Sequence, residues 1–447
     1  MDVIEAGSAA TSEGERKGIK AVVEADLGCE ISTFTRTLKQ DVDYAIDCGV
    51  DSIHLVVPVS DLHITEKLKK DRDYVMAAAG EVTDYAQEHG LIVELSGEDA
   101  SRADLDFVKA LFKTVKADRI CFCDTVGILT PERVTEVVHA LKGIAPLHLH
   151  CHNDLGLATA NSVKAIIEGA SGVHVTVNGI GERAGNASLE EVVMALKKLY
   201  RVDVKVRTER LYHLSKLVSR LTKIQPAPNK PLVGDNAFTH ESGIHVHGII
   251  ANSTTYEPMD PEEVGRRRRF VFGKHTGRKS IEMAVKELGI DASESELDEI
   301  LHRVKELGDL GKRVTDADLQ VIAETVTGVT KDPKVVLRDL AVVSGNRITP
   351  TASIKLLIDG KEVLEAGTGD GPVDAAMNAL RRAIGNMTEF KLDQYHVDAI
   401  TGGTDALVEV TVTLTKGDRV ITARGAGTDI IMASVDAMIE GINRLYR

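Results

Sequence analysis

The sequence predicts an α/β fold: a parallel sheet covered by helices, then a helical segment, then a smaller α+β domain. Short apolar runs alternate with helix-length amphipathic stretches over the first two thirds of the 447 residues, as in parallel sheets. Residues 208–335 have a mainly helical pattern that prolines interrupt early. Strand-type alternation marks residues 336–447. We therefore expect domains at 1–207, 208–335 and 336–447.

Seven strand-like runs make up the first domain. Most are separated from the next by a helix-length segment, which predicts parallel strands with crossover helices. The runs lie at residues 2–7, 29–34, 52–57, 91–96, 119–124, 143–152 and 172–177. Polar residues collect at or just beyond their C-terminal ends, at Glu98, Asp99, Asp124, Thr125, His150 and His152. In a (β/α)8 barrel this rim carries the chemistry, so we expect the site there.

His150 and His152 form the most informative pair. They lie two residues apart at the end of a strand, so their side chains share one face. Two imidazoles so placed can bind one divalent metal ion, although two ordinary strand-end histidines would give the same pattern. A second motif, NGIGERAGN at 178–186, follows the next strand. From there Asn186 can bring an amide oxygen to the same ion, which favours a metal site.

The composition predicts a cytoplasmic enzyme. A net charge of −14 argues against general nucleic-acid binding. No signal peptide precedes the first motif, and no apolar run approaches the roughly 18 residues that span a membrane. The five cysteines are scattered and predict no disulfide framework. The basic run at 266–269 predicts a solvated turn or, alternatively, a phosphate contact to a CoA-like ligand.

The motifs HCHND at 150–154 and NGIGERAGN at 178–186 resemble those of acyltransferases that condense acetyl-CoA with a 2-oxo acid. This family contains the 2-isopropylmalate, homocitrate and citramalate synthases. The resemblance covers nearly the whole chain and is greatest to the archaeal-type (R)-citramalate synthases. It implies a metal-binding TIM barrel, a helical linker region and a C-terminal regulatory domain that forms a homodimer and binds an amino-acid feedback effector.

The family's barrel begins with a strand that carries Arg-Asp-Gly, whose Arg binds the 2-oxo acid and whose Asp is a metal ligand. No Arg-Asp-Gly occurs in this sequence, and Met1 falls where the family's second strand begins. We therefore expect a (β/α)8 barrel that lacks its N-terminal strand. A start assigned too late explains this better than a real short form, because a seven-stranded remnant leaves two unpaired edges.

The resemblance also implies roles for single residues. Mn²⁺, Mg²⁺ or Zn²⁺ is expected as the divalent metal cation, with His150, His152 and Asn186 as ligands. The implied catalytic residues are Glu98, His245 and Tyr256, and the implied substrate-binding residues are Thr125, His54 and Ser96. Helix capping after a strand is the alternative explanation for the polar residues at 98–99 and 124–125.

The expected reaction joins acetyl-CoA to pyruvate and yields (R)-citramalate and CoA, the first step of a pyruvate route to isoleucine. A bound metal ion would act as a Lewis acid on the ketone carbon, and a positioned base would remove a methyl proton beside the thioester. Because one or two methylenes in a pocket change binding by only about 1–3 kcal/mol, 2-isopropylmalate and homocitrate synthesis remain alternatives. Two further alternatives are a metal-dependent aldolase or lyase and an inactive regulatory partner. No membrane or nucleic-acid partner is expected.

The C-terminal domain contains a weak internal repeat. Glycine-rich segments at 367–376 and 425–434 each follow strands and precede a helix, which predicts two ββα units. The glycines are compatible with a phosphate-binding loop, but no Gly-Lys-Ser/Thr or dinucleotide fingerprint accompanies them. Tight turns into helices are the better interpretation.

Overall fold

The computed structural model describes residues 2–240, 248–249, 252–274, 276–309, 314, 316–328, 333–399, 407–417 and 419–446. These residues form two compact units. The first comprises Met1–Thr239 and Glu257–Arg269, and the second comprises His240–Tyr256 and Phe270–Arg447. Each unit is described by itself below.

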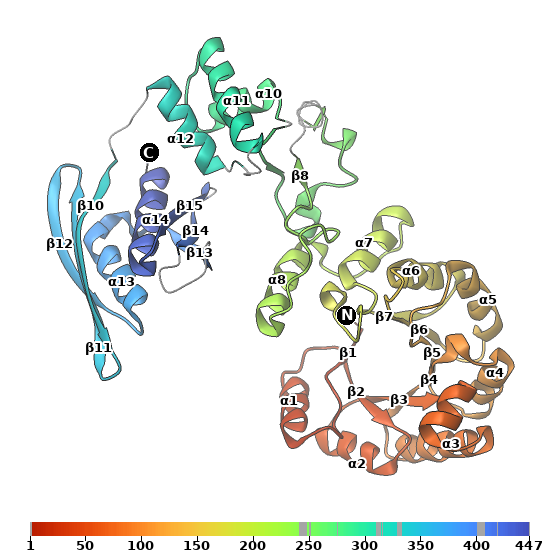
Figure 1. Ribbon diagram of the computed structural model, residues 1–447. Helices are drawn as coiled ribbons and strands as arrows, with labels where there is room; N and C mark the ends of the chain where they lie inside the picture. Colours follow the sequence, from red (N-terminus) through yellow and green to blue (C-terminus); the bar gives the residue numbers. More distant parts are fainter. Residues whose placement is uncertain are drawn as a thin grey trace. The chain divides into compact units, whose positions relative to one another are not determined.

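The first unit is built on a seven-stranded parallel sheet whose strands follow one another in chain order. Its strands are β1 (Val3–Glu5), β2 (Glu30–Arg36), β3 (Ser52–Pro58), β4 (Ile92–Glu98), β5 (Arg119–Asp124), β6 (Leu147–Cys151) and β7 (Gly172–His174). The sheet curves so that one face turns inward, and the crossover helices lie outside it (Figure 1). The predicted parallel sheet and its seven strands are confirmed.

The crossover helices cover the outer face of the curved sheet. They are α1 (Glu13–Glu24), α2 (Lys39–Cys48), α3 (Arg72–Glu88), α4 (Leu105–Thr114), α5 (Pro131–Leu141), α6 (Ala158–Glu168) and α7 (Leu189–Leu199). Polar caps start several of them, as where the Thr130 hydroxyl accepts from Arg133 N–H at the head of α5. The apolar stripe of α4, with Phe107 and Leu111, is buried against the sheet. One continuous apolar core thereby holds sheet and helices together.

Shorter elements complete the first unit. The irregular helix η1 (His63–Leu68) follows β3, η2 (Ala100–Arg102) follows β4, and η3 (Val177–Gly179) follows β7. Beyond η4 (Thr208–Arg210), α8 (Leu211–Thr222) and η6 (Pro261–Val264) share a small apolar cluster with α7.

The interpretation of the basic run at 266–269 as a solvated turn was wrong for Arg266 and Arg268, whereas Arg267 is exposed. Arg266 is buried, donates to the Gly234 carbonyl and stacks 4.7 Å from the Tyr212 ring centroid. Arg268 donates to the Glu257 carboxylate at 2.8 Å. Both side chains therefore connect this segment to its neighbours, and the buried Arg266 has the acceptor that a buried guanidinium group requires.

The second unit begins with short elements and a helical part. These are β8 (Thr239–His240), η5 (Ser253–Thr255), β9 (Arg269–Phe270), α10 (Arg278–Glu287), α11 (Glu294–Asp309) and α12 (Asp316–Thr327). The last three helices enclose a small core that includes Phe272, Ile300 and Leu319.

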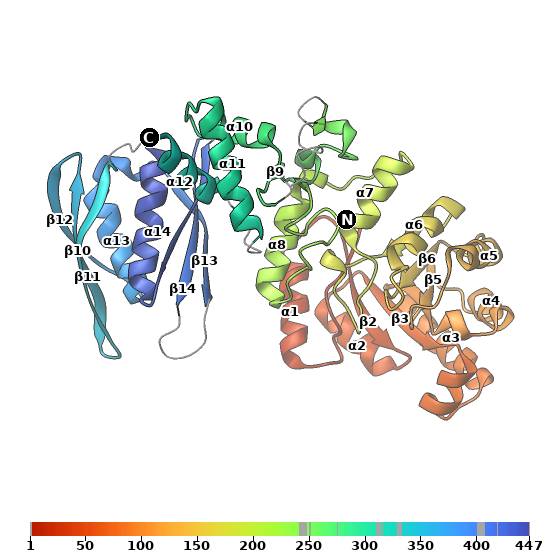
Figure 2. The same ribbon diagram turned by 45° about the horizontal axis from the view of Figure 1, so that its top comes forward.

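The C-terminal part contains two antiparallel sheets of three strands. One has β10 (Val335–Gly345), β11 (Ile348–Ile358) and β12 (Lys361–Thr368), followed by α13 (Pro372–Ile384). The other has β13 (Lys391–Ala399), β14 (Val408–Lys416) and β15 (Arg419–Gly427), followed by α14 (Ile430–Leu445). Figure 2 shows each helix beside the sheet it follows. A short 3₁₀ turn, η7 (Gly385–Thr388), links the two halves.

The repeat is therefore βββα, and the predicted ββα unit was one strand short. In both halves the pairing register shifts within the first strand, between Leu337 and Asp339 and between Leu392 and Gln394. Such a bulge interrupts the two-residue alternation that identifies a strand. The glycines do not form phosphate loops: a Cβ on Gly367 would lie 2.4 Å from the Ala379 nitrogen, so glycine lets strand and helix approach.

No helix within the described ranges is long and apolar enough to cross a membrane.

Candidate active site

Two columns of polar side chains, on the strands at either side of β5, line the inner face of the curved sheet. Glu94, Ser96 and Glu98 alternate along β4, and His148 and His150 alternate along β6. His152 continues the second column just past the strand, paired with Asn186 in an isolated bridge. Because alternate side chains share a face, each column runs from the interior of the sheet to its C-terminal rim. The rim residues are those that the sequence predicted.

The structure brings together the three residues predicted as metal ligands. His150 Nε2 lies 3.2 Å from His152 Nε2 and 3.1 Å from Asn186 Nδ2. The loop that carries Asn186 is attached to the histidine strand, since Asn153 N–H donates to the Gly185 carbonyl at 2.8 Å. Residues separated by more than thirty positions therefore meet at one point of the rim.

The electrostatics of this point suit a divalent cation. Burial, with the charge of His174, holds the pKa of His150 well below its ordinary value, and burial with Arg183 lowers the pKa of His152. Both rings therefore keep the lone pairs that a metal needs. The Asn186 amide turns Nδ2 toward His150 and Oδ1 toward Gly181. Rotation of the amide by half a turn would replace the N–H group that faces His150 with the amide oxygen, which can bind a metal. Two imidazole nitrogens and one amide oxygen are a set of ligands that fits a divalent ion.

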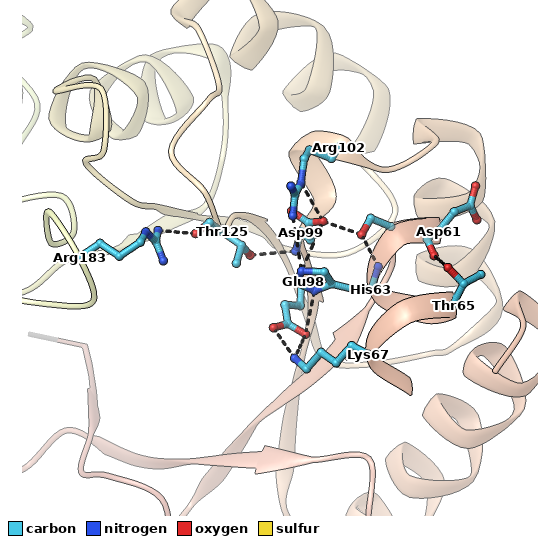
Figure 3. A network of polar contacts seen from close by, with 10 residues as sticks. Asp61, His63, Thr65, Lys67, Glu98, Asp99, Arg102, Thr125 and Arg183 are labelled. Carbon is cyan, nitrogen blue, oxygen red and sulfur yellow. Dashed lines mark hydrogen bonds and ion pairs between the residues drawn. The ribbon is translucent and has the colours of Figure 1, made fainter. Parts of the chain in front are cut away.

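Glu98 stands at the rim in an ion pair. Its carboxylate accepts from Lys67 Nζ of η1 at 2.7 and 2.8 Å, and His63 Nδ1 lies 3.6 Å away (Figure 3). The Glu98 side chain is 19% exposed. Sequence reasoning missed Lys67 and His63, because they enter the site from a helix after a different strand.

Asp99 is the centre of the polar network beside Glu98 (Figure 3). Its fully buried carboxylate accepts from Ser60 Oγ at 2.5 Å and from Arg102 Nε at 2.8 Å. Its backbone N–H donates to Thr125 Oγ1 at 2.8 Å. The Thr125 hydroxyl thus accepts from the backbone and keeps its own proton for another acceptor.

Arg183 ties the two rim loops together. It donates to Asp154 at 2.7 and 2.8 Å and to the Thr125 carbonyl at 2.7 Å. Asp154, the last residue of the HCHND motif, makes its described ion pair with Arg183. Arg183 lowers the pKa of Asp154 by donating to it.

His54 and Ser96 lie deeper than the rim. Both side chains are buried, and both adjoin cysteine thiols of β5: Ser96 interacts with Cys121 and His54 with Cys123. His54 Nδ1 lies 2.6 Å from the Glu5 carboxylate. Both residues belong to the strands whose C-terminal ends form the rim, so their position is compatible with the predicted substrate pocket.

An inner cluster, comprising Glu94, His148 and His174, lies below the rim. Glu94 contacts His174 Nε2 at 2.6 Å and His148 Nδ1 at 3.0 Å. One ligand atom each from His54, Glu94 and His174 lies within 4.8 Å of the others, so these three residues could also hold a metal ion. Sequence reasoning missed Glu94 and His174. The available signal was a charged or imidazole side chain inside a buried, otherwise apolar strand.

The two remaining predicted catalytic residues are His245 and Tyr256. His245 lies outside the described residues. Tyr256 belongs to the second unit, where it is 44% exposed.

Comparison with family models divides the chain into three consecutive matches. Residues 1–218 match the HMGL-like model, residues 232–312 match the homocitrate synthase post-HMGL domain-like model, and residues 313–446 match the LeuA allosteric (dimerisation) domain.

Comparison with whole proteins gives matches over the full chain. The chain is 54% identical over 452 residues to the (R)-citramalate synthase CimA of Methanocaldococcus jannaschii, covering 100% of this chain and 92% of that protein. It is 60% identical over 453 residues to a Methanosarcina acetivorans protein that carries the same name provisionally, covering 100% and 94%. A Methanopyrus kandleri protein, provisionally named a 2-isopropylmalate synthase, is 51% identical over 458 residues, covering 100% and 91%. The chain therefore belongs to the family of acyltransferases that contains the citramalate and 2-isopropylmalate synthases.

Proposed function

We propose that this protein condenses acetyl-CoA with pyruvate to give (R)-citramalate and CoA. The observation that carries the proposal is the identity of 54–60% over the whole chain to (R)-citramalate synthases. The rim supports it independently, because it offers a metal donor set, a carboxylate and a hydroxyl within one network.

His150, His152 and Asn186 would hold the divalent ion. When bound, a divalent ion supplies Lewis acidity at the ketone of a 2-oxo acid. The chain's own contribution is to keep both imidazoles neutral by burial. The bridge between His152 and Asn186 holds the third donor in place.

Glu98 is the proposed base that removes a methyl proton from acetyl-CoA. The ion pair with Lys67 at 2.7 Å holds the Glu98 carboxylate at the rim, where a substrate can reach it from solvent. A carboxylate in this position can accept the methyl proton of the substrate. Thr125 is proposed to donate its hydroxyl proton to the carboxylate of the 2-oxo acid, since its oxygen already accepts from Asp99 N–H. His54 and Ser96 are proposed as pocket walls, on the support of their buried positions on β3 and β4 below the rim.

His245 and Tyr256 remain proposed for the later step, in which water hydrolyses the CoA thioester and makes the sequence irreversible. The assignment of this step to the two residues rests on the family resemblance alone. Mn²⁺, Mg²⁺ and Zn²⁺ are the candidate ions, because imidazole and amide oxygen accept all three.

The proposal extends to assembly and location. A homodimer and an amino-acid feedback effector are proposed on the support of the match to the LeuA allosteric (dimerisation) domain at residues 313–446. The cytoplasm is proposed as the compartment, because all five cysteines are free and reduced thiols are usual there.

The test follows release of the CoA thiol from acetyl-CoA with pyruvate, 2-oxoisovalerate or 2-oxoglutarate, each with Mn²⁺ or Mg²⁺. Release with pyruvate alone is expected, and omission of the 2-oxo acid controls for simple thioester hydrolysis. The His152→Ala variant should lose this release. The matched His139→Ala variant, whose histidine pairs with Glu168 on the outer helices, should keep it.

Release mainly with 2-oxoisovalerate would make the protein a 2-isopropylmalate synthase, the second candidate that the Methanopyrus kandleri relative favours. Release with none of the three acids, from folded protein, would overturn the proposed condensation.

A further inference from the structure

The loop that carries Asn186 begins and ends at one point of the rim. We call residues 178–186 the metal loop, because Asn186 is a proposed ligand. The Asn186 N–H group donates to the Gly179 carbonyl at 3.0 Å, so the two ends of the metal loop are bonded to each other. The Thr176 hydroxyl donates to the Ile180 carbonyl at 2.6 Å and closes the base further. The position of Asn186 therefore depends on what holds Gly179.

Asn178, the residue before Gly179, contacts two helices at once. Its side-chain nitrogen Nδ2 lies 3.1 Å from the Ser215 carbonyl oxygen and 3.1 Å from Ser219 Oγ, both on α8. Its backbone N–H group donates to Glu190 Oε2 of α7 at 3.1 Å. Asn178, Ser215, Ser219 and Glu190 are all buried. The base of the metal loop is therefore bonded to α8 by a side chain and to α7 by the backbone.

We propose that Asn178 is a positioning residue that holds Asn186 in place for the metal ion by bonding the base of the metal loop to α8 and α7. This inference deepens the proposed function and rests on it in one respect, that Asn186 is a metal ligand. It gives a role to the first asparagine of the NGIGERAGN motif, to which the proposed reaction assigns no part.

The two contacts on α8 require the nitrogen of an amide. A backbone carbonyl only accepts hydrogen bonds, so the Asn178 atom that faces the Ser215 carbonyl must be a donor. The Ser219 hydroxyl gives its own proton to the Ser215 carbonyl at 2.8 Å, so its oxygen accepts from Asn178. Aspartate has nearly the same shape but would face both oxygens with an acceptor. The contact thus selects asparagine among side chains of this size.

The backbone of Asn178 also favours a short polar side chain. Its φ of +62° lies in the left-handed region, and Gly179 follows with a φ of +67°. Among residues other than glycine, asparagine and aspartate adopt this region most readily. The two left-handed residues turn the chain so that the Gly179 carbonyl meets the Asn186 N–H group. Such a conformation persists where the surrounding contacts hold it, and here α7 and α8 supply those contacts.

The contact on the α7 side has its own support. Lys230 Nζ lies 3.7 Å from Glu190 Oε1 and donates to Glu191 Oε1 at 2.7 Å. A buried carboxylate is retained only where charges and hydrogen-bond donors compensate for its lost hydration. The N–H group of Asn178 and the Lys230 ammonium group supply that compensation to Glu190. One carboxylate thereby joins α7, the segment around Lys230 and the base of the metal loop.

The alternative is that Asn178 stabilises the fold without acting on the metal site. Removal of its buried amide would then lower the free energy of unfolding and leave the affinity of the folded protein for a metal ion unchanged. If Asn178 positions Asn186, the folded variant itself binds the ion less tightly, because ordering the loop opposes binding. Metal affinity therefore separates the two roles.

The first experiment titrates the purified full chain with Mn²⁺, without acetyl-CoA, and measures free Mn²⁺ by electron paramagnetic resonance. Asn178→Gly permits the left-handed backbone and removes the contacts of the side chain with α8. We expect its Mn²⁺ affinity to fall about 10- to 100-fold, as when residues that orient metal ligands are removed. Gln87→Ala is the matched control. Gln87 also donates two hydrogen bonds, to the Lys116 carbonyl at 3.1 Å and to Asp118 at 3.0 Å, but near the start of β4. Its affinity should be unchanged.

A second pair of variants leaves the metal loop itself untouched. Ser219→Ala removes one acceptor of Asn178 from α8, whereas Ser215→Ala keeps the acceptor, because Ser215 contributes its carbonyl. Both serines are 1% exposed and lie one turn apart on the same helix, so the two changes are matched. Ser219→Ala should lower Mn²⁺ affinity about 2- to 10-fold, the effect of one hydrogen bond. Ser215→Ala should not change it.

A metal-free readout completes the test. Hydrogen exchange of the Asn186 N–H group, followed by mass spectrometry of peptides from the metal loop, reports how often its bond to the Gly179 carbonyl opens. Exchange should be faster in Asn178→Gly and Ser219→Ala by factors similar to their losses of Mn²⁺ affinity. It should be unchanged in Ser215→Ala.

Equal Mn²⁺ affinities in Ser219→Ala and Ser215→Ala, or unchanged exchange in Asn178→Gly, would overturn the proposal. A loss of affinity in Gln87→Ala equal to that in Asn178→Gly would do the same, as would a wild type that binds no Mn²⁺. If Asn178→Gly does not fold, the two serine variants decide. None of these readouts uses condensation. A protein that fails in the thiol assay but separates the two serine variants would therefore refute the proposed reaction and support this inference.

Discussion

Replacing Thr125 by Val tests the central contact of the rim. Val has nearly the same shape as Thr but no hydroxyl, so the change removes two hydrogen bonds and little volume. One is the bond from Asp99 N–H to Thr125 Oγ1 at 2.8 Å. The other is the proposed bond from the Thr125 hydroxyl to the carboxylate of pyruvate. Thr125→Ser is the matched control, because Ser keeps the hydroxyl and loses only a methyl group.

Two magnitudes follow from these contacts. Leaving Asp99 N–H without its partner should lower the free energy of unfolding by about 1–3 kcal/mol. Losing a hydrogen bond to a charged acceptor costs about 1.5–3 kcal/mol, and each 1.36 kcal/mol is about a factor of ten in rate. We therefore expect kcat/KM for pyruvate to fall about 10- to 150-fold in Thr125→Val.

The assay measures release of the CoA thiol at several pyruvate concentrations, and urea unfolding of both variants supplies the stability term. Thr125→Ser should stay within about threefold of the wild type, since hydroxyl chemistry is preserved. If Thr125→Val and Thr125→Ser have the same kcat/KM, the hydroxyl does not contact the substrate and the assignment is refuted.

Three further predictions concern the base, the metal and the pH. Glu98→Gln should lower kcat about 10²- to 10⁴-fold, because an amide cannot take the methyl proton. Its affinity for Mn²⁺, measured by titration of the purified protein, should stay at the wild-type value, and a kcat within fivefold of the wild type would exclude Glu98 as the base. Removal of divalent ions by a chelator should abolish thiol release, and added Mn²⁺ should restore it; undiminished release in the chelated protein would contradict the metal site. Glu30→Gln should lose about 1–2 kcal/mol of stability at pH 7, because solvent contact discounts its pair with Arg119. Burial opposes ionisation of Glu30, yet Arg119 lowers its pKa below 4.5, so this stability is present above pH 4.5 and lost as the pH falls through the folded-state pKa. Urea unfolding at pH 7 and pH 4 should show the variant and the wild type converging in acid; a constant difference would exclude this pair as the cause.

The inner face of the sheet is unusual in being polar below the rim. Glu5, Glu94 and His174 occupy positions that apolar side chains normally fill in such sheets. Buried charges persist only when other charges and hydrogen bonds compensate for lost hydration. The contacts of Glu94 with His174, His148 and Arg119 supply that compensation.

The pattern of residues predicted the first unit well, for a local reason. Strand and helix periodicity depends on neighbours within a few positions, so the order of residues is enough to locate all seven strands. The face shared by His150 and His152 follows from the same two-residue period. The C-terminal repeat, predicted one strand short in each half, shows where this method fails, since a bulge interrupts the two-residue period in β10 and in β13.

The sequence by itself therefore determined the parallel sheet, its rim and the histidine pair, together with the family resemblance carried by two motifs. The tertiary structure alone decided which side chains meet: Lys67 with Glu98, Asp99 with Thr125, and Glu94 with His174. These partners lie 26 to 80 positions apart in the chain. Their meeting depends on the register between strands and on the curvature of the sheet, neither of which leaves a periodic signal in the sequence.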